Sequence, residues 1–148
     1  MGVGVGVGVG EKNQIHVVLG FDFGFKKIGV AIGQTITRSA NPLTILKANR
    51  GTPDWSEIKK LITEWGVDAL IVGLPLNMDG TEQPITKQAR AFGEQLKKQF
   101  QLPVYFVDER LTTVAAKNEM HSTLKGADRF EHADSVSAKL IVESWMGK

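Results

Sequence analysis

The chain contains no cysteine among its 148 residues. A disulfide framework, a thiolate metal site and a thiol nucleophile are therefore excluded, and any metal chemistry has to use oxygen or imidazole ligands. No apolar run approaches the roughly 20 residues that a membrane-spanning helix needs, and no secretion signal is recognisable. We therefore expect a cytoplasmic protein with no membrane partner.

Proline is scarce as well, with five residues, and the charges nearly balance to a net +2. A chain of this length suits one globular domain, and its small positive charge permits a polyanionic partner without requiring one. Residues Gly2 to Gly10 alternate strictly between glycine and valine, which makes a stable strand costly. We expect a flexible leader over residues 1–13 and a single domain over residues 14–148.

Five buried strands are predicted after the leader, three of them before any helix. They are expected at Ile15–Asp22, Ile28–Ile32, around Leu43–Ile45, at Ala69–Leu74 and at Val104–Val107. Thr52 is expected to cap the first helix, with Pro53 at its first position. The apolar stripe of this helix consists of Trp55, Ile58, Leu61, Ile62 and Trp65, and Gly66 ends it.

The later helices complete an alternating pattern. They are expected from about Thr86 to Phe100, near Thr112 or Thr113, and from about Ala133 to Trp145, with a polar loop over His121–Phe130. Three consecutive strands followed by helix-separated strands imply a mixed sheet with helices on both faces. The predicted class is α/β, in the element order of the ribonuclease H-like fold, with a mixed five-stranded sheet flanked by helices.

Carboxylates follow or precede these elements at three places. Asp22 ends the first strand, Asp108 and Glu109 follow the fifth, and Asp134 is expected to open the last helix. If these ends meet, the carboxylates repel one another unless a hard divalent cation neutralises them, and two such ions can activate a water and stabilise a leaving oxygen. The pattern predicts a magnesium or manganese site for phosphodiester chemistry.

Each acid also has a purely structural interpretation. Asp22 before Phe23-Gly24 is typical of a tight turn, Glu109 beside Arg110 of a loop ion pair, and Asp134 of a helix cap. Asp22 stands out because it follows an almost unbroken apolar run, where burial is costly unless compensated. The residues alone leave Asp108 and Glu109 as competing ligands.

Candidate phosphate contacts are less specific than the acids. The loop from Gly73 to Gly80 leaves a strand end and is expected either to connect two elements or to form one wall of a substrate groove. The candidate nucleic-acid contacts are Lys26, Lys27, Asn77, Arg90 and Arg110, with Lys87 and Lys117 as further cations. Each of these cations taken singly also fits a solvated surface charge.

Four segments carry a resemblance to a known family. They are Leu19–Gly24 with Lys27–Ala31, then Ile71–Thr81, then Val107–Thr113, and finally Asp134-Ser135. In this order they resemble the YqgF/RuvX family of pre-16S rRNA nucleases and Holliday-junction resolvases. The segment Lys125–His132 departs from the basic run often found in that family, because its charges are mixed.

The resemblance implies a ribonuclease H-like fold, a cytoplasmic divalent-metal nuclease, and a role in trimming the 5′ end of the 16S rRNA precursor. It implies Asp22, Glu109 and Asp134 as catalytic and metal-binding residues, with Mg²⁺ or Mn²⁺. A structured RNA precursor is the favoured partner and branched DNA the second. Other hypotheses are a non-catalytic ribosome-assembly module and, from Asp-Phe-Gly after a strand, an actin-like kinase.

Overall fold

The structure, a computed structural model, describes residues 15–109 and 126–147, and for residues 126–135 it describes the backbone alone. The described part contains a six-stranded sheet and three helices. The strands are β1 (Val17–Asp22), β2 (Lys27–Gln34), β3 (Ser39–Asn49), β4 (Thr52–Pro53), β5 (Ala69–Leu74) and β6 (Val104–Asp108). The helices are α2 (Trp55–Trp65), α3 (Pro84–Phe100) and α5 (Gly126–Met146).

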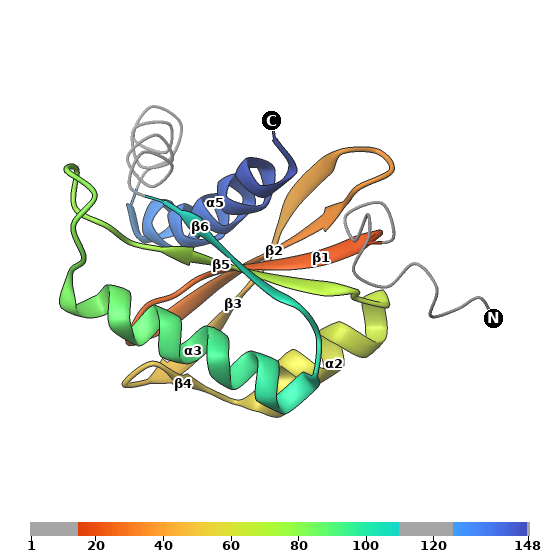
Figure 1. Ribbon diagram of the computed structural model, residues 1–148, viewed down its shortest axis with the longest axis horizontal. Helices are drawn as coiled ribbons and strands as arrows, with labels where there is room; N and C mark the ends of the chain where they lie inside the picture. Colours follow the sequence, from red (N-terminus) through yellow and green to blue (C-terminus); the bar gives the residue numbers. More distant parts are fainter. Residues whose placement is uncertain (1–14, 110–125, 148) are drawn as a thin grey trace.

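The sheet is mixed, with the strand order β4-β3-β2-β1-β5-β6 (Figure 1). The strands from β1 to β4 pair in antiparallel fashion, whereas β5 and β6 run parallel to β1. Parallel strands need a crossover, and α3 supplies the one between β5 and β6. The carboxyl ends of β1, β5 and β6 therefore lie at one edge of the sheet.

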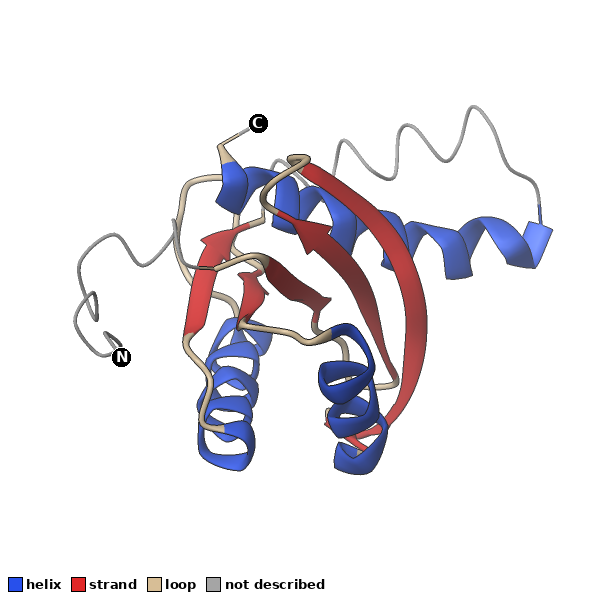
Figure 2. Cartoon of the chain, turned by 90° about the vertical axis from the view of Figure 1, so that its right-hand side faces the viewer, coloured by secondary structure: helices blue, strands red, loops and turns tan. Residues whose placement is uncertain are grey.

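Helices cover both faces of the sheet, as the sequence predicted. In Figure 2, α2 and α3 lie below the sheet and α5 lies above it. The lower core includes Phe21, Ile58 and Phe92, and the upper core includes Val18 and Ile141. The two cores alternate along β1 because successive side chains of a strand point to opposite faces. This alternation assigns each strand-end carboxylate to one face.

The sheet has six described strands rather than the five predicted, because β4 was missed. Thr52 pairs with Asn49 across a tight turn at Arg50 and Gly51, whose φ angles are 54° and 85°. Positive φ at both central residues gives the turn the twist of a two-residue hairpin. β2 and β3 also extend beyond their predicted ends, since β3 pairs along the whole length of β2.

The N-cap of α2 is Asp54, so the prediction of Thr52 as cap and Pro53 as first helical residue was wrong. The Asp54 carboxylate accepts hydrogen bonds from the hydroxyl of Ser56 at 2.6 Å and from its backbone N–H at 3.0 Å. These bonds favour the ionised form and lower the pKa of Asp54, the side-chain bond most. Of the predicted apolar stripe, Ile58 is fully buried but Trp65 is 39% exposed.

The two other helices begin earlier than predicted. α3 begins at Pro84 rather than Thr86, and α5 begins at Gly126, so the predicted loop is wrong over residues 126–130. Asp134 consequently lies about two turns inside α5 instead of opening it. The predicted helix near Thr112 lies outside the described residues. None of the described helices has the length and apolarity to cross a membrane.

Candidate active site at the carboxyl edge of the sheet

Asp22 is the last residue of β1 and is half-buried. Gly20, two residues earlier on the same face, lies under α5: a Cβ there would be 3.2 Å from the carbonyl oxygen of Ala138. Because side chains alternate along a strand, Asp22 projects to the face that α5 covers. The buried run Val18–Phe21 holds the carboxylate on one of the two innermost strands of the sheet.

Glu109 follows β6 and is 2% exposed. Its backbone N–H donates to the carbonyl of Leu74 at 3.2 Å, which continues the pairing of β6 with β5. Its side chain turns back over β5, since a Cβ on Gly73 would lie 3.0 Å from Glu109 Oε2. The absence of a side chain at Gly73 makes room for this carboxylate.

Gly73 links the two acids. Phe21 of β1 pairs with Val72 of β5, so Asp22 and Gly73 occupy the next positions along two adjacent parallel strands. Both lie on the face under α5, because Ile141 of that helix is also in contact range of a Cβ at Gly73. The structure therefore brings Asp22 and Glu109 to one face and one edge of the sheet, on either side of Gly73.

Asp108 points the other way. Phe106, two residues earlier, packs against α3, where a Cβ on Gly93 would be 2.5 Å from Phe106 Cε1. By alternation Asp108 also belongs to the α3 face, and it is exposed. The two acids that the sequence left as competing ligands thus lie on opposite faces of the sheet, Glu109 on the face of Asp22 and Asp108 on the face of α3.

Asp134 is placed by the backbone of α5 alone, because its side chain lies outside the described residues. Ser137, Ala138 and Ile141, which share its helical face, are all buried against the sheet. At the far end of α5, Met146 O accepts a hydrogen bond from Arg38 Nη2 at 3.2 Å, beyond the amino end of β1. The N-terminal half of α5, which contains Asp134, therefore lies toward the end of β1 that carries Asp22.

The donor set fits a hard divalent cation. A carboxylate as buried as that of Glu109 is costly unless hydrogen bonds or positive charge compensate it. Magnesium commonly takes one or two carboxylates and completes its shell with water and substrate phosphate. Within residues 15–109 and 136–147, no three His, Asp or Glu side chains gather closely enough to hold a metal ion. Of the three candidate acids, the side chains of Asp22 and Glu109 are the two that lie in the described part of the chain.

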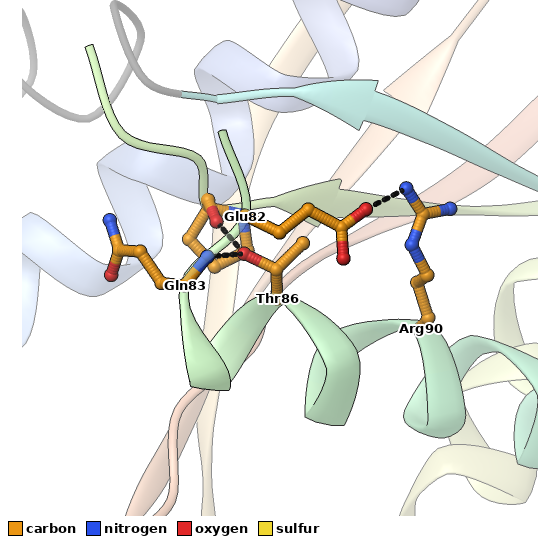
Figure 3. A network of polar contacts seen from close by, with 5 residues as sticks. Glu82, Gln83, Thr86 and Arg90 are labelled. Atoms are coloured by element: carbon orange, nitrogen blue, oxygen red, sulfur yellow. Dashed lines mark hydrogen bonds and ion pairs between the residues drawn. The ribbon is translucent and has the colours of Figure 1, made fainter. Parts of the chain in front are cut away.

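The β5–α3 loop, residues 75–83, rises from the same edge and is internally bonded. Asn77 Nδ2 donates to Thr81 Oγ1 at 2.9 Å, and Thr81 donates to Asp79 Oδ1 from both its N–H and its hydroxyl. The base of the loop is fixed to α3, because Thr86 Oγ1 accepts from the N–H of Gln83 and donates to the carbonyl of Pro75 (Figure 3). The loop is thus a braced structure next to the acids.

The predicted phosphate contacts differ in their surroundings. Lys26 is exposed in the segment that joins β1 to β2, and Lys27 is exposed at the first position of β2, both at the edge that carries Asp22. Arg90 instead forms an ion pair with Glu82, with Nη2 and Oε2 2.8 Å apart (Figure 3). Asn77 is held by the loop itself, and Arg110 lies outside the described residues. Within the described residues, Lys26, Lys27 and the further cation Lys87 on α3 are exposed and form no described ion pair. Lys117 lies outside the described residues.

Sequence reasoning missed two residues that shape this edge. Gly73 was placed near the end of the predicted strand Ala69–Leu74 and at the start of a loop that was expected to connect two elements or to form one wall of a groove. No role was given to its missing side chain, although a glycine at the end of a buried strand can indicate close approach of another group. Thr86 was read as the start of a helix. The spacing of Gln83 and Thr86 around Pro84 is similar to that of a capping box, which indicates a bonded N-terminus.

Comparison with known proteins identifies the family. The family model described as RuvX: Holliday junction resolvase matches residues 16–148. A Coxiella burnetii protein named "Putative pre-16S rRNA nuclease" is 53% identical over 135 residues, covering 90% of this chain and 94% of the relative. A Nitrosococcus oceani protein of the same name is 51% identical over 130 residues, covering 88% and 86%.

Two solved structures support the fold. RuvC of T. thermophilus, solved with a Holliday junction substrate, has a TM-score of 0.52 at 15% identity, covering 89% of this chain and 96% of that one. The fowlpox virus Holliday junction resolvase has a TM-score of 0.51 at 14% identity, covering 88% and 96%. These likenesses concern the ribonuclease H-like fold alone. The sequence matches, with the family model spanning residues 16–148, establish that the chain belongs to the RuvX family.

Proposed function

We propose that this chain is a metal-dependent nuclease that hydrolyses phosphodiester bonds in the 5′ region of the 16S rRNA precursor during ribosome biogenesis. The observation that carries the proposal is the placement of the nearly buried Glu109 carboxylate beside Gly73, next to Asp22 on the adjacent strand. The names of relatives that are 51–53% identical support the choice of substrate. A cytoplasmic location is part of the proposal, because bacterial rRNA is processed there.

Asp22, Glu109 and Asp134 are the residues that would hold Mg²⁺ or Mn²⁺ in this proposal. Bound at this edge, such ions supply Lewis acidity and a water activated for attack on phosphorus. The chain itself contributes rigid placement: Asp22 is held by the sheet, and Glu109 is held under α5 by packing on Gly73. Fixed carboxylates need little rearrangement as the reaction proceeds, which favours catalysis.

The substrate has to approach beside the β5–α3 loop. Its internal hydrogen bonds and its anchoring at Thr86 give the loop a defined shape from Pro75 to Gln83. We propose that it forms one wall of the groove for the nucleic acid. Because the loop is already fixed to α3, it does not have to become ordered when the nucleic acid binds, which lowers the cost of binding.

Branched DNA is the second candidate substrate. The description of the matched family names a Holliday junction resolvase, and this observation favours it specifically. The chemistry at phosphorus would be the same for RNA and DNA, so the same acids serve either substrate. The shape of the bound nucleic acid would then decide between them.

The decisive experiment compares cleavage of an end-labelled 16S precursor RNA and a four-way DNA junction, each with Mg²⁺ or Mn²⁺. The wild type is compared with Asp22→Asn, which removes a metal-binding charge and keeps the side chain's shape. Glu94→Gln, at an exposed position of α3, is the matched control. We expect the wild type and Glu94→Gln to cleave the RNA and Asp22→Asn to be inactive.

Cleavage of the junction but not the RNA would move the proposal to DNA resolution. Cleavage that persists in Asp22→Asn would contradict the proposed active site. If no substrate is cleaved and no divalent ion binds at millimolar concentration, the non-catalytic assembly module replaces the nuclease. Circular dichroism of each variant checks that the fold is retained.

A further inference from the structure

Two lysines lie directly opposite each other on adjacent strands, and neither forms an ion pair with an acid in the described part of the chain. Lys27 of β2 is the register partner of Lys47 of β3, and both side chains are exposed. Like charges directly opposite on antiparallel strands are destabilising. The pair therefore lowers the stability of the free protein, unless an anion binds between or above the two ammonium groups.

Two further cations flank this pair in turns that are bonded together. The N–H of Ala48 donates to the carbonyl of Lys26 at 2.8 Å, and the N–H of Gly51 donates to the carbonyl of Phe25 at 2.8 Å. These bonds fix the β1–β2 segment against the β3–β4 turn, whose first residue is Arg50. We call Lys26, Lys27, Lys47 and Arg50 the basic strip.

Arg50 has a φ of 54°, a backbone conformation that favours glycine or asparagine. An arginine there is strained, so the turn carries a long cation at a position where a smaller residue would be more stable. All four residues of the basic strip are exposed, and within the described part of the chain none of them forms an ion pair. These four positive charges are therefore not neutralised by the described acids.

The lysine pair lies on the same face as the proposed active site. Asp22 pairs with Gly29 of β2, and Gly29 pairs with Ile45 of β3. Lys27 and Lys47 are the next same-face positions along β2 and β3. One such two-residue step along a strand spans about 7 Å. Because β2 and β3 lie one and two strand spacings of about 4.8 Å from β1, Lys27 and Lys47 are about 8 and 12 Å from Asp22 along the sheet. These distances are about two to four steps of 3.4 Å, the rise per nucleotide along one strand of duplex DNA.

We propose that the basic strip binds the phosphodiester backbone of the nucleic-acid substrate on the β2–β3 side of the acids, about two to four nucleotides from the bond that is cut. This inference rests on the proposed function for the class of substrate. Lysine and arginine contacts to phosphate position a nucleic acid without reading its sequence. The strip therefore orients the backbone across the edge of the sheet, whereas the acids act at the bond itself.

The test measures binding separately from cleavage. A fluorescent duplex RNA is titrated in EDTA at several salt concentrations with the wild type, Lys47→Glu, Lys27→Gln and the control Lys59→Glu. Lys59 is exposed on α2, at the opposite face, and carries the same charge change as Lys47→Glu. We expect Lys47→Glu to bind about tenfold more weakly at 0.1 M salt, with a salt slope about one unit shallower, and Lys27→Gln to change in the same direction.

Thermal unfolding separates this role from a structural one. Lys47→Glu places opposite charges across the strands, so its Tm should equal or exceed that of the wild type while its binding weakens. Binding by Lys47→Glu and Lys27→Gln that matches Lys59→Glu would overturn the basic strip and leave the nuclease intact. If these variants bind more weakly but the wild type cleaves neither RNA nor DNA, the binding role of the basic strip is supported and the proposed nuclease function is contradicted.

Discussion

Gly73 occupies the point at which α5, β5 and Glu109 meet. A methyl group there would enter the space of the Ile141 side chain and lie 3.0 Å from Glu109 Oε2. Neither neighbour has free room, because Ile141 is fully buried and Glu109 is 2% exposed. At the scale of single residues, the candidate site therefore depends on one missing side chain as much as on its acids.

Gly73→Ala should reduce both stability and cleavage. Overpacking of this kind typically lowers the free energy of unfolding by about 1–3 kcal/mol. The displaced carboxylate should reduce the rate of cleavage further than the loss of folded protein explains. Chemical denaturation and single-turnover cleavage of the RNA, measured on the same preparation, check the two effects.

Gly93→Ala provides the matched control on the other face. A Cβ at Gly93 would be 2.5 Å from Phe106, so the stability cost should be similar, but no proposed ligand is near. We expect Gly93→Ala to cleave at the wild-type rate per folded molecule. Equal activity losses in the two variants would mean that Gly73 acts only through stability.

Among the single residues, Asp22 was recognisable because it directly follows a buried strand. The choice between Asp108 and Glu109 was not, since adjacent residues point to opposite faces and the register of β6 decides which one faces α5. The turn predicted at Phe23-Gly24 has a local need for glycine, because a Cβ at Gly24 would lie 2.5 Å from the carbonyl oxygen of Lys27.

At the scale of elements, the β5–α3 connection is fixed by Thr86. This residue is fully buried, and its hydroxyl bonds the N–H of Gln83 and the carbonyl of Pro75. Both partners are backbone groups, which cannot be left unpaired in a buried site without a penalty. The hydroxyl therefore links the end of β5, the loop and the start of α3.

Thr86→Val should loosen this connection, because valine fills nearly the same volume and cannot form the two hydrogen bonds. Leaving buried backbone groups unsatisfied costs about 1–3 kcal/mol. We expect faster amide hydrogen exchange in residues 75–83 and a higher KM for the nucleic acid. Thr86→Ser, which keeps the hydroxyl, should resemble the wild type; if valine and serine behave alike, the missing bonds are not the cause.

At the scale of the whole molecule, two helical layers and one mixed sheet hold the acids on a single face. Ligand binding to such a site stabilises the folded state by mass action. At ten times its dissociation constant, Mg²⁺ should raise the free energy of unfolding of the wild type by about 1.4 kcal/mol and that of Asp22→Asn by much less. Thermal shift titrations with Mg²⁺ and Mn²⁺ measure the difference, and equal shifts in both proteins would contradict the proposed ligand role.

The sequence by itself determined the α/β class, the helices on both faces, the strand β5 with its bounds, and Asp22 as a strand-end acid. These features depend on local apolar patterns and on residues adjacent in the chain. Boundaries that depend on contacts were missed, as at the start of α5, whose polar first turns carry no apolar period to predict them.

Only the tertiary structure decided which carboxylates share a face and which cations lie beside them. Lys27 and Lys47 are separated in sequence and become neighbours through the register of β2 and β3. Glu109 reaches the site because Gly73, on a different strand, leaves space for it. The physical reason is the same in both cases: strand register and packing join residues that are distant in the chain, and no local pattern encodes that pairing.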